Sequence, residues 1–466
     1  MNILERNTPP QLTSIISIIS ILLFLPLLLF ATYQSVTLIT RAVGTPARIV
    51  VDTKAILEPI KTDFYHAFAQ GGEESEDMIG PVLSEVKGLR PKFIRIDHIY
   101  DYYSVVQGSG GGMSFDFSRL DNAVNSILAA GAKPVLALSY MPPSIAQGGA
   151  VINPPNDWND WATVVEKTIQ HYSGKGEKNL GGVYYEVWNE PDLASFGSWK
   201  LSGDKNYLTL YKYAAEGAKR VQNTNWFYFG GPATTGLYKN WIMALASSGH
   251  RVDFFSWHSY LPDPKRYTTD QANFITWMLP YPWHTLKPTL ITEFGFTGDK
   301  SSLYNTSYAA AYTAAVIRQL ISGGASYIFS FELKDGPGQT NGWGLIAHQN
   351  AGKKPKPRYW VYSFVDQMAG NRLQLTGEGT WVTGFASIKE KTIRLFLVNF
   401  DRSGSHVETV PITFTNLDPG VYTVKQNFLF GTDTSQSQQT DQTGTLDLKL
   451  YMGAQSVVIV ELTKTE

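Results

Sequence analysis

The sequence of 466 residues contains no cysteine. Disulfide bonds, thiolate metal sites and cysteine nucleophiles are therefore excluded. Charged residues are also scarce, at 17% of the chain, and the formal net charge is −1. Such a chain lacks the broad basic surface that binds nucleic acid, so we expect no nucleic-acid partner. It also lacks recognisable metal-binding, phosphate-binding and dinucleotide-binding motifs, and we therefore expect no cofactor and no metal.

Apolar and aromatic residues, by contrast, are plentiful. Hydrophobic residues make up 43% of the chain and aromatic residues 13%. This composition is typical of a well-packed globular protein and excludes a mostly disordered one. The length accommodates a barrel of ~250 residues or more together with a smaller module. We therefore expect two folded domains and a neutral or weakly charged ligand.

An uncharged segment at residues 12–40 precedes the body of the chain, and its central part, residues 15–31, is almost wholly apolar. A helix needs ~20 mainly apolar residues to cross a bilayer. We therefore interpret residues 1–44 as a cytoplasmic stub followed by a transmembrane helix that anchors the protein in the lipid bilayer. The alternative is a cleaved signal peptide, whose apolar region runs for only ~7–15 residues.

From residue 63 onward, short apolar runs alternate with longer amphipathic ones, which is the pattern of β-α units around a parallel sheet. Helical spacing of apolar residues appears between them, as at residues 120–130 and 207–221, and an eighth helix is expected near residues 358–368. We predict a (β/α)8 TIM barrel over residues 45–370. Its eight strands are expected at residues 63–69, 92–97, 133–140, 182–188, 226–230, 252–258, 289–293 and 325–332.

The sequence pattern changes after residue 370, where short runs of alternating apolar and polar residues are separated by turn residues such as Asp418-Pro419-Gly420. This pattern predicts an antiparallel β-sandwich over residues 371–466. The polar stretch at residues 432–445 is expected to be a long exposed loop. Residues 45–60 contain a short strand at 48–52 that is placed to pair with this distant module.

Two of the predicted barrel strands end in glutamates, at Asn189-Glu190-Pro191 and at Thr292-Glu293-Phe294. Catalytic groups of such a barrel sit where the strands end. A lone glutamate there is usually a solvated rim residue, but two carboxylates across one mouth suit cleavage of a glycosidic bond. Carboxyl groups ~5–5.5 Å apart give retention of configuration and ~6.5–9.5 Å gives inversion, and the sequence leaves this distance open.

The two glutamate motifs resemble those of the clan A glycoside hydrolases, and the chain as a whole is most similar to glycoside hydrolase family 39. The resemblance covers roughly residues 60–370. Glu186-Val187-Trp188-Asn189-Glu190-Pro191 is highly specific for the clan. The family resemblance depends on further motifs at residues 93–98, 115–121, 131–142, 230–233 and 257–260.

This resemblance implies a role for each of five residues. Glu190 is expected to be the general acid/base, and Glu293 the nucleophile of a double displacement through a covalent glycosyl-enzyme. Asn189 is expected to bond the 2-hydroxyl of the sugar. Tyr260 would hold the nucleophile in place, and Arg95 would stabilise its negative charge.

Other residues near strand ends are candidates to bind the sugar. His258 on the sixth strand is either a sugar contact or a satisfied structural histidine. The family usually shows Arg-x-His after the second strand, whereas here Asp97 takes that place and the histidine follows as His98. The eighth strand ends with Glu332 instead of the family's tryptophan-rich sequence. The aromatic candidates for stacking on a sugar ring are Tyr140, Trp188, Phe196, Trp199 and Trp343.

We therefore expect a retaining glycoside hydrolase that acts on extracellular or cell-surface polysaccharide, with its catalytic part outside the membrane. Two alternatives stay open. One is a non-catalytic carbohydrate-binding protein on the same barrel, and the other is a transglycosylase that uses the same covalent intermediate. The sequence identifies neither the sugar and its linkage nor the oligomeric state.

Overall fold

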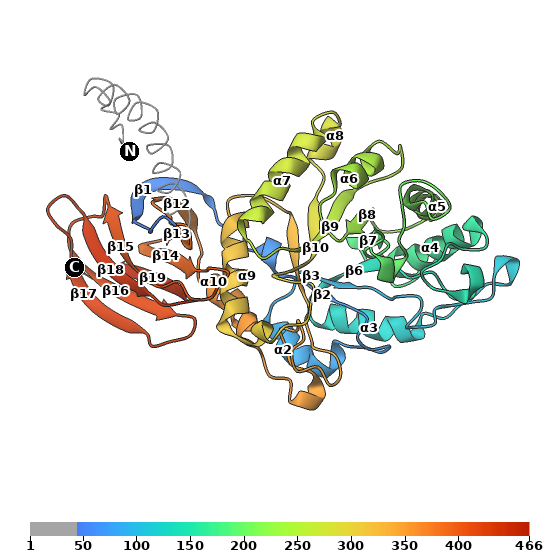
Figure 1. The fold of residues 1–466 in the computed structure, drawn as a ribbon, viewed down its shortest axis with the longest axis horizontal. Helices are drawn as coiled ribbons and strands as arrows, with labels where there is room; N and C mark the ends of the chain where they lie inside the picture. Colours follow the sequence, from blue (N-terminus) through green and yellow to red (C-terminus); the bar gives the residue numbers. More distant parts are fainter. Residues whose placement is uncertain (1–43, 466) are drawn as a thin grey trace, which may run out of the picture.

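The fold was obtained as a computed structural model that describes residues 44–465 (Figure 1). The membrane helix predicted at residues 12–40 lies outside the described residues. Within residues 44–465, no helix combines the length and apolar character needed to cross a bilayer.

Eight parallel strands close into a barrel in the order β10-β11-β2-β3-β6-β7-β8-β9, which confirms the predicted architecture. Aromatic side chains such as Phe93, Tyr184 and Phe254 fill part of its interior. The first strand is shorter than predicted because Asp63–Tyr65 forms a 3-10 helix. The strands are β2 (Ala67–Gln70), β3 (Phe93–Ile96), β6 (Lys133–Leu138), β7 (Val183–Val187), β8 (Phe227–Thr234), β9 (Phe254–Tyr260), β10 (Thr289–Gly295) and β11 (Tyr327–Phe331).

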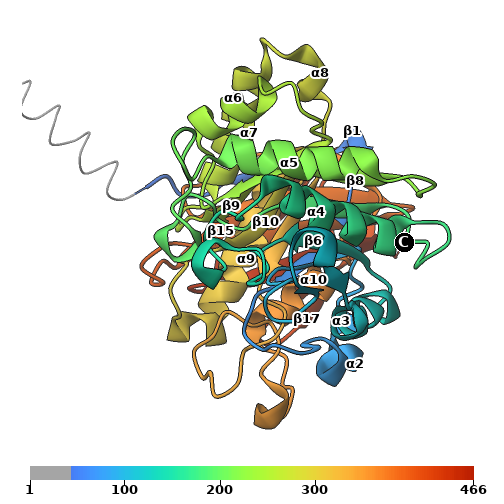
Figure 2. The ribbon, with the colours of Figure 1, turned by 90° about the vertical axis from the view of Figure 1, so that its right-hand side faces the viewer.

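Helices cover the outside of the barrel (Figure 2). Their apolar residues recur at three- and four-residue spacing, so that one face packs on the strands. In α3, for example, Leu120, Ala123, Val124 and Ile127 are buried. The helices are α2 (Leu83–Gly88), α3 (Ser118–Ala129), α4 (Trp158–Ser173), α5 (Tyr207–Arg220), α6 (Lys239–Ala246), α7 (Lys265–Met278), α8 (Pro282–Thr285), α9 (Ser307–Leu320) and α10 (Trp360–Val365).

The C-terminal part forms a β-sheet domain of nine strands in the order β17-β16-β19-β14-β13-β12-β1-β15-β18. β1 (Ile49–Pro59) comes before the barrel in sequence, yet it pairs with β12 antiparallel and with β15 parallel. The sequence had suggested a purely antiparallel sheet, but β1 and β15 run parallel to each other. The other strands are β12 (Asn371–Thr376), β13 (Val382–Lys389), β14 (Thr392–Asn399), β15 (Glu408–Thr415), β16 (Val421–Phe428), β17 (Thr434–Gln439), β18 (Leu446–Met452) and β19 (Val457–Lys464).

Alternate residues of β14 face two different cores. Leu395 and Leu397 belong to the core of the sheet domain, which also contains Val410 and Ile412 of β15. Phe396 and Val398 of β14 belong to the core that includes the barrel helices. One face of β14 therefore packs on other strands of the sheet domain, and its other face packs on the barrel.

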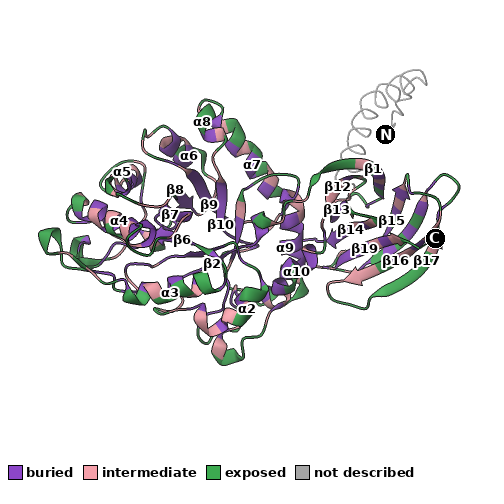
Figure 3. Cartoon of the chain, turned by 180° about the vertical axis from the view of Figure 1, so that it is seen from behind, coloured by how far each residue is buried: buried purple, intermediate pink, exposed green. Residues whose placement is uncertain are grey.

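The prediction of a long loop at residues 432–445 is wrong, because Thr434–Gln439 forms the edge strand β17. The side chains of this strand are almost all exposed, and Figure 3 shows the edge in the colour of exposed residues. An edge strand exposed on both faces has no apolar alternation, so hydrophobic periodicity could not reveal it. β12 was missed as well, since only Leu373 of its six residues is buried.

Helix α9 joins the two domains. The ring of Phe400, which follows β14, packs against Tyr308 and Tyr312 with centroids 5.2 and 5.6 Å apart. Arg318 of the same helix donates a hydrogen bond to the Gly384 carbonyl of β13 at 3.0 Å and forms an ion pair with Glu378. The contact is therefore both apolar and polar.

We expect a chain that ends at residue 370 to be insoluble. Truncation there would remove both partner strands of β1 and would uncover the aromatic face of α9, which exposes a large apolar patch. The measurement is the soluble fraction after expression, compared with that of the full chain. A soluble truncated barrel with native circular dichroism would contradict this dependence.

Candidate active site

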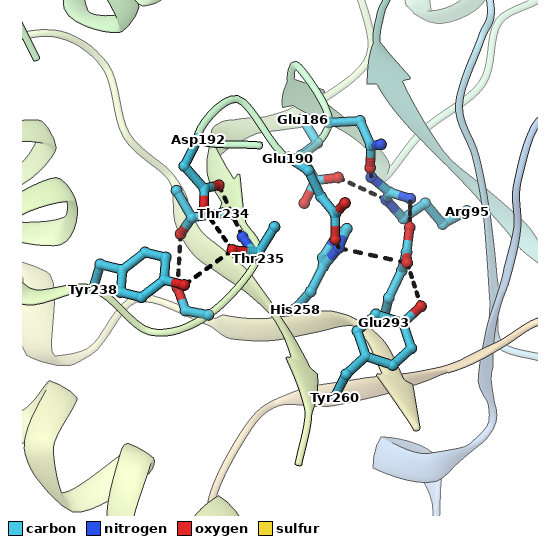
Figure 4. A network of polar contacts seen from close by, with 12 residues as sticks. Arg95, Glu186, Glu190, Asp192, Thr234, Thr235, Tyr238, His258, Tyr260 and Glu293 are labelled. Carbon is cyan, nitrogen blue, oxygen red and sulfur yellow. Dashed lines mark hydrogen bonds and ion pairs between the residues drawn. The ribbon is translucent and has the colours of Figure 1, made fainter. Parts of the chain in front are cut away.

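Two buried carboxylates come together at the carboxyl ends of β7 and β10 (Figure 4). Glu190 follows β7 with a positive φ of 42°, and its backbone N–H donates to the Ala233 carbonyl at 2.9 Å. Glu293 lies within β10 and is 5% exposed. A carboxylate oxygen of Glu190, a ring nitrogen of His258 and a carboxylate oxygen of Glu293 all lie within 4.8 Å of one another.

This separation bears on the stereochemistry of any reaction between the two carboxylates. Carboxyl groups ~5–5.5 Å apart allow direct attack on a sugar carbon, whereas a gap of ~6.5–9.5 Å leaves room for an attacking water. One oxygen of Glu190 and one of Glu293 lie within 4.8 Å of each other, which agrees with the closer spacing. The geometry therefore fits a retaining pair.

Arg95, on β3, is fully buried and binds three partners at once. Its Nη1 donates to Glu293 at 2.9 Å, and its Nη2 donates to Asn189 at 2.7 Å. Its Nε donates to Glu186 at 2.7 Å, a buried carboxylate that the sequence interpretation had not singled out. The fixed fork of the guanidinium thus holds Asn189 and Glu293 in one orientation.

Two side chains from β9 contact the carboxylates from the other side. The hydroxyl of Tyr260 donates to Glu293 Oε2 at 2.6 Å. The Nδ1 atom of His258 lies 2.8 Å from Glu190 Oε1 and 3.5 Å from Glu293 Oε2. Because side chains alternate along a strand, residues 258 and 260 both face the interior. His258 therefore bridges the pair, and it is fully buried instead of lining the cavity.

The charges of this cluster are coupled. Burial raises the pKa of Glu293 to about 6, although His258 and Arg95 both favour its carboxylate form. Burial also disfavours the charged form of His258, but Glu293 and Glu190 outweigh this effect and raise the pKa of the imidazole. Glu293 is thus mainly ionised at neutral pH, as a nucleophile must be.

Asn189 completes the inner wall. Its Oδ1 accepts from Arg95, and its Nδ2 donates to the hydroxyl of Tyr140 at 2.7 Å. The side chain lines the cavity while these two bonds fix its orientation. The amide is therefore held rigidly beside Glu190, where a ligand hydroxyl can reach it.

The carboxylates open into a cavity of about 600 Å³ at the carboxyl ends of the strands. This volume lies within the ~300–1,000 Å³ usual for ligand sites. Of the predicted residues, Asn189, Glu190, Tyr260, Glu293, Asp97, His98, Phe196 and Trp343 line it. Residues that the sequence interpretation did not include also line it, among them Glu73, Leu193, Ser195, Thr235, Asp299 and Phe331.

Several predicted contacts lie elsewhere. Trp188 and Trp199 are fully buried and pack on each other with ring centroids 5.3 Å apart, so neither is available to a sugar ring. Tyr140 is 1% exposed and acts behind Asn189 instead of stacking on a ligand. Glu332 is buried, and its Oε2 accepts from Gln70 at 3.2 Å. None of these four side chains lines the cavity, so the structure does not bring them to the place where a sugar would contact them.

A hydrogen-bond network that was not expected from the sequence holds one rim of the cavity. Asp192 accepts a hydrogen bond from the backbone N–H of Thr235 at 2.9 Å and another from its hydroxyl. The hydroxyl groups of Thr235 and Tyr238 are 3.0 Å apart (Figure 4). The loops after β7 and β8 are thereby tied together beside Glu190.

The two catalytic-site carboxylates and His258 were also considered as ligands of a metal ion. Glu190, His258 and Glu293 are a group of described residues whose ligand atoms are close enough to hold a metal ion. However, His258 is already bonded to Glu190, and Glu293 accepts from both Arg95 and Tyr260. The chemistry that a carboxylate pair supplies needs no metal.

Comparison with known proteins adds a family and two sets of relatives. Residues 85–392 match the family described as glycosyl hydrolases family 39. The chain is 27% identical over 337 residues to a β-xylosidase of Caldicellulosiruptor saccharolyticus, covering 64% of this chain and 66% of that protein. It is 28% identical over 301 residues to a β-xylosidase of Geobacillus stearothermophilus, covering 57% of this chain and 58% of that protein. The chain thus spans less than two thirds of the length of these curated relatives.

Solved structures share the fold. A family 39 enzyme from Xanthomonas axonopodis pv. citri superposes with a TM-score of 0.71 at 16% identity, covering 90% of this chain and 98% of that one. A monomeric β-xylosidase from Caulobacter crescentus superposes with a TM-score of 0.69 at 20% identity, covering 90% and 100%. At such identities the likeness is one of fold.

We expect Tyr260→Phe to raise the pKa of Glu293 by about 1, because a hydrogen bond to a charged group is worth ~1.5 kcal/mol and favours the ionised form. The measurement is a pH titration of the glutamate carboxyl carbons by NMR, with the signal assigned by its loss in Glu293→Gln. Tyr451→Phe, at an exposed position of the sheet domain, is the matched control. A Glu293 pKa that does not move in Tyr260→Phe would contradict the role given to this hydroxyl.

Proposed function

The chain belongs to glycosyl hydrolases family 39, and on that premise we propose that it hydrolyses glycosidic bonds with retention of configuration. The observation that carries the proposal is the approach of Glu190 and Glu293 to within 4.8 Å at the mouth of the barrel. Retaining cleavage uses a carboxyl pair at about this spacing. A protein that only binds sugar has no need of two buried carboxylates at this distance.

In the first step, the carboxyl group of Glu190 gives its proton to the glycosidic oxygen as the bond to the anomeric carbon breaks. A carboxylate oxygen of Glu293 attacks that carbon, and the leaving sugar departs with the proton. In the second step, Glu190 takes a proton from water as the water oxygen attacks the anomeric carbon. The ester bond to Glu293 breaks, and both carboxyl groups return to their starting states.

The surrounding residues support this exchange of charge. Arg95 and Tyr260 both donate to Glu293, so they hold it ionised and aimed at the cavity. Asn189 is fixed beside Glu190 and presents its amide to the 2-hydroxyl of the sugar, a contact that strengthens in the transition state. His258 Nδ1 lies 2.8 Å from Glu190 and 3.5 Å from Glu293, so its charge responds to both carboxylates as the proton leaves Glu190 and is replaced from water.

The substrate is proposed to be a β-linked oligo- or polysaccharide. The curated relatives are named β-xylosidases, and this supports a β-glycoside as the bond cleaved. Half-buried aromatic side chains in the cavity wall, Phe196 and Trp343, offer apolar faces for a sugar ring.

The protein is further proposed to work outside the cell, tethered to the membrane. The uncharged apolar segment at residues 12–40 supports an anchor of this kind. A tethered enzyme suits a polymer at or near the cell surface. Partition of the full chain between membrane and soluble fractions, before and after deletion of residues 12–40, tests this setting.

We expect Glu190→Gln and Glu293→Gln each to lower kcat by three or more orders of magnitude, roughly the contribution of an acid/base or a nucleophile. The measurement is hydrolysis of nitrophenyl β-xyloside and of xylo-oligosaccharides. Glu216→Gln, on the outer face of α5, is the matched control and keeps full activity. Near-normal turnover in either active-site variant, with the fold intact, would end the assignment.

Azide distinguishes the two roles. In Glu190→Ala we expect external azide to restore part of the activity and to give a glycosyl azide of retained configuration, because it attacks the covalent intermediate. In Glu293→Ala it replaces the nucleophile itself and gives the inverted product. Proton NMR of the anomeric signal reads the outcome, and a reversed pattern would exchange the roles of the two glutamates.

A further inference from the structure

Asp97 is a buried carboxylate in the cavity wall that the proposed reaction does not use. It follows β3, two residues after Arg95, so the two side chains lie on the same face of the chain. Asp97 lines the cavity and is 5% exposed, and neither of its carboxylate oxygens accepts a hydrogen bond within residues 44–465; Oδ1 is buried, so Oδ2 is the oxygen that a ligand can reach. A buried acceptor without a donor is costly, and it is stabilised when a ligand supplies the donor.

The rest of the cavity wall is acidic as well. Beside the catalytic pair and Asp97, the carboxylates of Glu73 and Asp299 line it, and no lysine or arginine does so among the described residues. His98 is the basic side chain of the wall, and its Nδ1 is already 2.7 Å from Asp101 Oδ2. A ligand in this cavity therefore meets a cluster of carboxyl groups, and burial raises the pKa of Asp97 and of Glu73.

The nearest lysine and arginine side chains lie outside the lining of the cavity. Arg95 is fully buried, and all three of its nitrogens are bonded to Glu186, Glu293 and Asn189. Lys300 is exposed, and its ammonium lies 5.1 Å above the ring of Trp343. It is therefore placed at the mouth of the cavity.

We propose that Asp97 accepts a hydrogen bond from the bound sugar and that, with Glu73 and Asp299, it makes the cavity selective for the charge of that sugar. Sugars that carry a free ammonium group bind best, neutral sugars bind less tightly, and uronic acids bind most weakly. The inference deepens the proposed function, because it names the substrate class of the same site.

The order follows from the chemistry of the donor. An ammonium group both donates to Asp97 Oδ2 and neutralises the field of the other carboxylates, and a charge-assisted bond is stronger than a neutral one. A hydroxyl supplies the bond without the charge. A uronate carboxylate supplies neither, and it adds a negative charge close to those already in the wall, so it is rejected.

Three β-1,4-linked trisaccharides of the same shape test this order. They are the glucosamine trimer, which bears ammonium groups, cellotriose, which is neutral, and the glucuronate trimer made by oxidation of its C6 hydroxyls. Binding is measured by calorimetry at pH 7 in 150 mM salt, with the full chain carrying Glu190→Gln to stop turnover. We expect the glucosamine trimer to bind about tenfold more tightly than cellotriose, and the glucuronate trimer about tenfold more weakly.

Asp97→Asn in the same background identifies the residue responsible. It keeps the size of the side chain and removes the charge, so we expect the three affinities to come within about threefold of one another. Asp418→Asn removes the same charge from an exposed site on the sheet domain and is expected to leave the tenfold steps unchanged. If Asp97→Asn unfolds, Glu73→Gln provides the test. It is expected to reduce the differences in affinity among the three trisaccharides.

Uronate binding as tight as neutral binding would overturn the inference, and so would the original order surviving in Asp97→Asn. Failure of all three sugars to bind would also overturn it. Failure of the proposed function has a different signature. In that case the wild-type chain hydrolyses no glycoside, while the charge order in the binding experiment persists.

Discussion

The site depends on one buried guanidinium. Arg95 brings a positive charge into the barrel interior, where an unpaired ion would cost several kcal/mol. Its bonds to Glu186 and Glu293 neutralise that charge, and its bond to Asn189 adds a neutral acceptor. Because the guanidinium is planar and its donors point in fixed directions, these three acceptors cannot reorient independently. Removal of Glu186 or Glu293 would take away one of the two carboxylates that compensate this buried charge, and breaking a buried ion pair costs ~3–5 kcal/mol.

The barrel makes this arrangement possible, since parallel strands end at one rim and residues two apart on a strand share a face. Arg95 lies on β3 and Asp97 directly follows that strand, while His258 and Tyr260 both lie on β9. In the closed order of the strands, β3 and β7 each lie three positions from β10, on opposite sides, so Arg95 reaches Glu293 across the interior. Catalytic geometry is thus a consequence of strand closure, and the sheet domain contributes by packing on α9 and not by reaching the cavity.

Much of this could be predicted from the sequence. The eight barrel strands follow from apolar runs between amphipathic helices, and the two glutamates follow from motifs at strand ends. Trp188 was misplaced because its φ of 74° turns the chain between β7 and Glu190, so the indole enters the core while the next two side chains face the cavity. Alternation along an ideal strand cannot foresee such a turn. Glu73 was missed because it lies in a loop without a recognisable sequence pattern. Glu186 could have been found, because it is the first residue of the motif that ends in Glu190-Pro191.

The central claim is that Glu293 becomes covalently bonded to the sugar while Glu190 moves the proton. The most direct measurement is to incubate the protein with a 2,4-dinitrophenyl 2-deoxy-2-fluoro-β-xyloside and to locate the adduct by peptide mass spectrometry. Fluorine at C2 slows both steps, and the reactive leaving group allows the first step to outrun the second, so the intermediate accumulates. The account predicts one fluoroxylosyl group on Glu293, released when an acceptor sugar is added. An adduct on Glu190, or burst release of dinitrophenol without any adduct on Glu293, would contradict it.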